Sequence, residues 1–192
     1  MNNRIKRAAF IIIFGSVWGG SEMFLGGFLH ALHIPMRGMI MSCVGAFVLI
    51  SANFWAGGRG ISLTIGCIAA FLKLFSLGGL VLSPAVAIIF ESAIAEVVFG
   101  VFKYGRTASM LTGAGIVVYT VIHRFGAMLL IYRNEISEIW ETFYSDGSIF
   151  SKIGVKSLLI VLILYVMIHL FLGAAVGLAA YYTVHKADKR IG

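Results

Sequence analysis

Charge is scarce in this sequence. Only 12% of its 192 residues are Asp, Glu, Lys or Arg, whereas 60% are hydrophobic, and the mean hydropathy is +0.98. A soluble globular domain carries roughly 25% charged residues, which keep its surface hydrated. The composition therefore excludes a soluble globular protein and predicts an integral membrane protein in a lipid bilayer.

Cysteine is also scarce, with two residues in the whole chain. Cys43 and Cys67 lie inside apolar runs without CxxC spacing, which argues against a disulfide framework and a zinc site. Their expected depths differ, which disfavours a shared iron–sulfur cluster and with it a redox subunit. We interpret both as small buried hydrophobic residues.

The motifs of membrane hydrolases are missing as well. The sequence has no HExxH, GxSxG or paired-glutamate motif. Ser83, beside Pro84, has no evident base within reach, although a serine nucleophile requires one. We therefore expect neither an enzyme nor a resident cofactor or metal.

Long apolar runs are abundant. A helix needs about 20 apolar residues to cross a bilayer, and six runs are of about this length or longer: 8–29, 36–54, 61–80, 84–102, 108–131 and 155–182. Helices are expected because backbone groups in lipid must bond within their own segment, and the runs lack the alternation of barrel strands. The prediction is an all-α, compact bundle of six transmembrane helices, forming a single domain over residues 1–192.

The basic residues are unevenly distributed between the two ends of these helices. One end carries Arg4, Lys6, Arg7, Arg59, Lys103, Arg106, Lys186, Lys189 and Arg190. The other end carries Arg37, Arg133, Lys152 and Lys156. The positive-inside rule then places both termini in the cytoplasm. Because this bias also explains the net charge of +7, we expect no nucleic-acid partner.

The joint 132–154 is the longest between the runs and would be external. Its segment EISEIWETFY repeats apolar residues at helical spacing, which is typical of an amphipathic helix on a membrane surface. The segment is interpreted either as a lid over the bundle or as an interfacial anchor. No cleavage site follows the first run, so the first helix is expected to be retained.

Five ionisable residues from four runs fall at one depth, in the outer part of the bundle, if each residue rises about 1.5 Å along its helix. They are Glu22, Lys73, Glu91, His123 and Arg124. A single charge at such depth costs on the order of 3 kcal/mol, so these groups should face one another or water. A structural role is sufficient to explain any single pair of these charges, in which Lys73 or Arg124 pairs with Glu91 or Glu22 and holds two helices together. The whole set favours a pocket, open to the outside, for a charged or zwitterionic solute.

Two further histidines extend one face of the first helix beyond Glu22. His33 follows at helical steps and His30 lies beside it, while Pro35 ends the helix. Both are interpreted either as pocket residues or as polar residues at the membrane interface. Glu22, His30, His33, Glu91 and His123 are suitable ligands for nickel or cobalt, so a transition-metal permease subunit is the alternative function.

The stretches WGGSEMFLGGFLHALHIPMRG and GLVLSPAVAIIFESAIAE, with the six runs, resemble the substrate-binding S-components of energy-coupling factor transporters. The resemblance implies a bacterial cytoplasmic-membrane protein that captures a small water-soluble vitamin or related nutrient. It places the solute site where Glu22, Lys73, Glu91 and His123 lie.

The resemblance also implies a scaffold membrane subunit and separate ATPase subunits, since this chain has no Walker motif. The family docks its scaffold subunit through an AxxxA motif on the first helix. Here the residue four positions after Ala8 is Ile12 and not alanine. The expected docking pair is therefore Gly15 and Gly19, which are also spaced by four residues.

Overall fold

The structure is a computed structural model that describes residues 3–33, 36–75, 82–131 and 155–191. These residues form only helices and turns. The helices are α1 (Asn3–Ala31), α2 (Arg37–Ala56), α3 (Ile61–Leu74), α4 (Leu82–Phe102), α5 (Arg106–Ile131) and α7 (Val155–Ile191). The predicted all-α fold is thus confirmed for the described residues, and the predicted external segment 132–154 lies outside them.

Five helices are long and apolar enough to cross a membrane: α1, α2, α4, and the segments Arg106–Gly126 of α5 and Leu162–Arg190 of α7. The chain therefore has the character of a multi-pass membrane protein. The fourteen residues of α3 span about 21 Å, less than the roughly 30 Å of a bilayer core. The run predicted for this helix continues to residue 80, but residues 76–81 lie outside the described part. Six crossings therefore remain a prediction.

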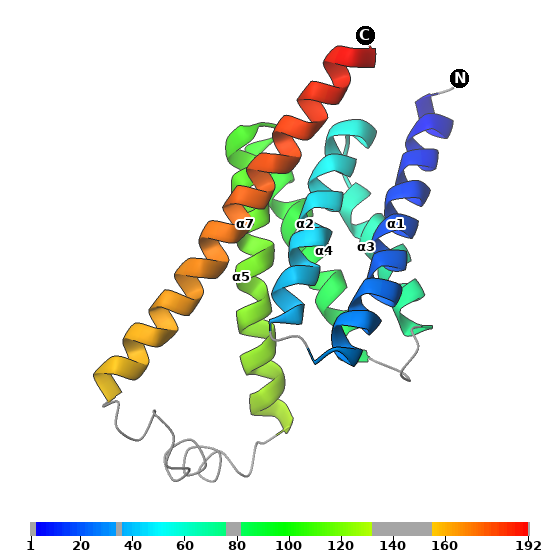
Figure 1. The fold of residues 1–192 in the computed structure, drawn as a ribbon. Helices are drawn as coiled ribbons and strands as arrows, with labels where there is room; N and C mark the ends of the chain where they lie inside the picture. The colour runs from blue at the N-terminus through cyan, green and yellow to red at the C-terminus, as the bar shows by residue number, and fades with distance from the viewer. Residues whose placement is uncertain (1–2, 34–35, 76–81, 132–154, 192) are drawn as a thin grey trace.

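The first residues of α1 and the last residues of α7 lie at the same end of the bundle (Figure 1). Helix α1 packs on α2 and α3, α3 packs on α4, and α5 packs on α7. Trp18, Leu49, Ile65 and Ile116, all fully buried, belong to the apolar core between these helices. The core thus holds α1 to α5 together around one centre.

Glycines set the distance between several helices. A Cβ atom added at Gly177 of α7 would lie 2.1 Å from the backbone oxygen of Ser109 on α5. A Cβ at Gly173 would lie 2.4 Å from the backbone oxygen of Gly113. These backbones are in direct contact, as expected for small residues spaced by four in membrane helices.

Gly15 and Gly19 serve the same purpose between α1 and α3. A Cβ at Gly15 would lie 2.9 Å from the Cβ of Ile68, and one at Gly19 would lie 2.6 Å from Cδ1 of Leu72. Both glycines are buried. They are used for packing within the chain, so in this structure the pair expected to dock another subunit is not on a free surface.

The turn between α2 and α3 requires glycine. Gly57, Gly58 and Gly60 have φ angles of 50°, 128° and 81°, which L side chains rarely adopt. The carboxylate of Glu96 on α4 accepts hydrogen bonds from the backbone N–H groups of Gly60 and Ser62 at the start of α3. A carboxylate there satisfies N–H groups that have no partner within the helix and also favours the helix dipole.

Candidate solute-binding site

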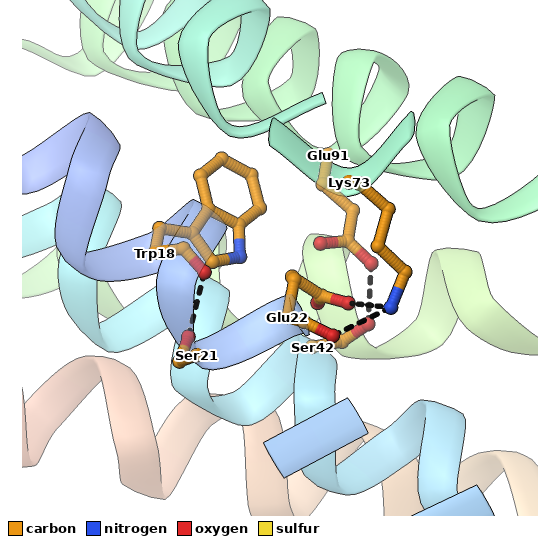
Figure 2. Close-up of polar contacts among 6 residues, drawn as sticks. All are labelled: Trp18, Ser21, Glu22, Ser42, Lys73 and Glu91. Carbon is orange, nitrogen blue, oxygen red and sulfur yellow. Dashed lines mark hydrogen bonds and ion pairs between the residues drawn. The ribbon is translucent and has the colours of Figure 1, made fainter. Parts of the chain in front are cut away.

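Four buried polar side chains from four helices meet in the half of the bundle away from the chain termini. We call Glu22 of α1, Ser42 of α2, Lys73 of α3 and Glu91 of α4 the polar cluster (Figure 2). Their exposed fractions are 6%, 3%, 7% and 4%. The cluster contains three of the five residues that the sequence placed at one depth.

Lys73 is held by Glu22 alone among the charged groups described. Its Nζ lies 3.3 Å from Oε2 of Glu22 and donates a hydrogen bond of 2.6 Å to the Glu22 backbone oxygen. Lys73 also lies in the last turn of α3, where a cation stabilises the helix dipole. The ion pair therefore joins α1 to the end of α3.

Gly26 makes room for this ion pair. A Cβ atom at Gly26 would lie 3.0 Å from Nζ of Lys73 and 3.6 Å from Oε2 of Glu22. The glycine follows Glu22 by one helical turn, so it faces the same neighbour as the carboxylate. A side chain at this position would displace the ammonium group.

Glu91 is the second carboxylate of the polar cluster. It accepts a hydrogen bond from the hydroxyl of Ser42, and its side chain points toward the same space as those of Glu22 and Lys73 (Figure 2). The described residues place two carboxylates but one ammonium group in the cluster. Because the Lys73 ammonium is already paired with Glu22, the hydrogen-bond donor to Glu91 is the hydroxyl of Ser42.

Trp18 lies one turn before Glu22 and is fully buried. Its indole N–H lies on the side of the ring that faces Glu22 (Figure 2), and the Glu22 carboxylate is its neighbouring hydrogen-bond acceptor. Gly45 of α2 leaves room for the ring, since a Cβ there would lie 2.8 Å from the indole nitrogen. The indole therefore lies between the α2 backbone and the Glu22 carboxylate and forms part of the surroundings of the ion pair.

His123 belongs to a second polar group, next along the bundle. Its Nε2 lies 3.1 Å from the hydroxyl of Ser83, and its Nδ1 lies 3.4 Å from the hydroxyl of Tyr119. The Tyr119 ring stacks on Phe90, the neighbour of Glu91, with ring centres 5.6 Å apart. The expectation that Ser83 has no partner is therefore wrong, because helix packing brings α4 and α5 together at this level.

This serine–histidine contact lacks the orienting acid of a hydrolase triad within the described residues. The second ring nitrogen of His123 faces a phenol rather than a carboxylate, whereas a nucleophile's base is usually oriented by a third group. The contact therefore joins α4 to α5 and adds polar atoms beside Glu91.

The other expected site residues lie outside the polar cluster. The side chain of Arg124 is exposed on α5, and those of His30 and His33 are exposed at the end of α1. His30 bonds to Arg37 at the start of α2. In the described residues no three His, Cys, Asp or Glu side chains come close enough to hold a metal ion together.

Sequence reasoning missed Ser42 and Trp18 as members of the site. The only available signal for Ser42 was a hydroxyl inside an apolar run, since α2 contributes no charge at this depth. For Trp18 the signal was its position four residues before Glu22, as Gly26 lies four residues after it. These residues fill the same helical face as the carboxylate.

Comparison of the chain with protein-family models, with curated proteins and with solved structures gave no match in any of the three. The chemical interpretation of the site therefore depends on its own contacts. These are a buried ion pair between Glu22 and Lys73, and a second buried carboxylate, Glu91, that is bound by the Ser42 hydroxyl. Together they come from four helices of a multi-pass membrane protein.

Proposed function

We propose that the chain is the solute-capture subunit of an uptake transporter of the energy-coupling factor type. Its solute would be a small water-soluble vitamin or a related nutrient. The observation that supports this proposal is the polar cluster, because charged groups inside a membrane bundle are costly and usually mark a ligand or ion pathway. A helix-joining role accounts for the Glu22–Lys73 pair and for the Ser42–Glu91 hydrogen bond, but it does not require a second buried carboxylate beside the first.

The charge of the cluster indicates which part of a solute would bind there. Lys73 is neutralised by Glu22, and Glu91 has the Ser42 hydroxyl as its donor. An amine or a protonated ring nitrogen of the solute would be the natural partner of Glu91, since hydrogen bonds between charged groups are the stronger ones.

The proposal includes a location and partners. The termini would lie in the cytoplasm of a bacterium and the polar cluster in the outer half of the inner membrane. A scaffold membrane subunit would dock on the outward face of α1, since Gly15 and Gly19 are occupied by α3. That outward face carries Gly20, which has no neighbouring atom within 4 Å of an added Cβ, and the exposed Val17.

Reconstitution into lipid vesicles tests the dependence on partners. The isolated chain is expected to bind solute but not to accumulate it, because its sequence contains no Walker motif and the energy would come from separate ATPase subunits. Uptake should be measured with radiolabelled candidate vitamins, with and without ATP inside the vesicles. Sustained concentrative uptake by the isolated chain without ATP would contradict the proposed role.

A further inference from the structure

We propose that a basic cavity at the terminal end of the bundle binds the phosphate of an anionic phospholipid headgroup. The cavity has a volume of about 400 Å³ and is lined by Asn3, Lys6, Arg7, Trp55, Ala56 and Gly57. It lies between the first turns of α1 and the last turn of α2. The proposal is independent of the solute site, which occupies the other half of the bundle.

The charged residues that line this cavity are all positive. Two cationic side chains, Lys6 and Arg7, line it, and none of its lining residues is acidic. The side chain of Lys6 is exposed and makes no ion pair with a described residue. Such a cavity attracts an anion, and basic pockets between membrane helices are known to bind lipid headgroups.

Arg7 is preorganised for binding. Its guanidinium group donates a 2.9 Å hydrogen bond to the backbone oxygen of Arg59 and lies directly against Gly58, where an added Cβ would be 2.4 Å from the guanidinium. This contact uses one of five N–H donors. The remaining donors form the planar fork that binds phosphate in bidentate fashion.

Trp55 indicates that the anion is a lipid and not a free ion. The Trp55 ring packs against the ring of Phe10, which lies one turn beyond Arg7 on α1, and the two ring centres are 5.8 Å apart. Tryptophan is enriched at the level of the headgroups in membrane proteins. On α1, Ile12 and Ile13 are exposed apolar side chains that would face the acyl chains of the lipid.

A purely structural role explains Arg7 but not Lys6. Arg7 ties α1 to the turn between α2 and α3, and a general positive-inside bias explains the number of charges at this end. Neither explains a cavity with two cations on one wall and an interfacial tryptophan in its lining. A structural role for Arg7 or a general positive-inside bias predicts little effect of replacing Lys6 on lipid binding, whereas a headgroup site predicts weaker binding.

Native mass spectrometry of the purified full chain in detergent tests the proposal. Titration with phosphatidylglycerol is expected to show one preferred molecule per chain, with phosphatidylcholine binding more weakly. Lys6→Gln should weaken the phosphatidylglycerol complex about fivefold, the usual effect of one cation near a lipid surface. Arg7→Gln should weaken it about tenfold or more, because a charged hydrogen bond is lost.

Lys186→Gln is the matched control, since it removes one exposed positive charge from the last two turns of α7, and the end of α7 lies at the same end of the bundle as the start of α1. It should change the affinity by about twofold at most, as is usual for an isolated surface charge. Equal effects of Lys6→Gln and Lys186→Gln, or equal binding of the two lipids, would overturn the proposal. So would displacement of the lipid by inorganic phosphate at equal concentration, which would identify a site for a free anion. Lys6→Gln keeps the test valid if Arg7→Gln impairs folding.

Discussion

Replacing Lys73 by methionine is expected to destabilise the folded bundle by about 3–5 kcal/mol, because it leaves a buried charge without its partner. Glu22 is buried, and Lys73 is its ion-pair partner in the described structure. The same ammonium group also binds the Glu22 backbone oxygen. The loss should appear as a lower midpoint of unfolding in detergent, measured by tryptophan fluorescence.

The double variant Glu22→Gln with Lys73→Met is the control for this effect. It removes both charges together, and replacing a whole buried ion pair is often neutral or stabilising. Most of the stability lost in Lys73→Met should therefore return, which gives a large coupling energy in the double-mutant cycle. Equal losses in the single and double variants would contradict the pairing of these two residues.

Gly177→Ala is expected to destabilise the contact between α5 and α7 by about 1–3 kcal/mol, the usual range for overpacking. The added methyl group would meet the backbone oxygen of Ser109 at 2.1 Å. A backbone cannot move aside as a flexible side chain can, so the two helices must separate. The thermal unfolding midpoint should fall, although alanine by itself favours a helix over glycine by about 1 kcal/mol.

Gly100→Ala provides the matched control for Gly177→Ala. Gly100 is exposed on α4, and no atom lies within 4 Å of a Cβ added there. The intrinsic preference of alanine should therefore raise or maintain the midpoint in this variant. A fall of similar size in both variants would show that the close contact between α5 and α7 is not the cause.

Much of the fold was predictable from the sequence, because lipid requires long apolar helices. Each of the six described helices overlaps one predicted run, but their ends differ. Helix α7 continues to Ile191, beyond the predicted end at residue 182, and α1 begins at Asn3. An apolar run marks the lipid-facing part of a helix, whereas hydrogen bonding continues into polar residues such as those of the α7 end.

The depth of the site residues along the bundle was predictable from the sequence, but the contacts between them were not. Counting about 1.5 Å per residue placed Glu22, Lys73 and Glu91 at one level, and the structure brings them together. The count carries no information about how each helix is rotated. It therefore could not show that Lys73 pairs with Glu22, or that Arg124, next to His123 in sequence, points outward.

The histidine residues show the same limit. His30 and His33 follow Glu22 at helical spacing, but both side chains are exposed, His30 in the last turn of α1 and His33 in the turn after Ala31. His33 itself has a φ angle of 52°, outside the helical range. A pattern that assumes a continuous helix cannot predict where the backbone leaves it.

The binding of a solute by the polar cluster is tested most directly by identifying the molecules that co-purify with the protein. Mass spectrometry and metal analysis should be applied to the same samples of wild type, Glu91→Gln and Asp188→Asn. Asp188 is an exposed carboxylate on α7, so its amide variant controls for the loss of one negative charge.

We expect one organic solute per chain in wild type and in Asp188→Asn. Glu91→Gln should bind the same solute about tenfold to a hundredfold more weakly, as expected when a charged hydrogen bond is lost, while its unfolding midpoint stays close to that of wild type. Retention of the solute by Glu91→Gln, or stoichiometric nickel or cobalt without an organic ligand, would contradict the proposed solute site.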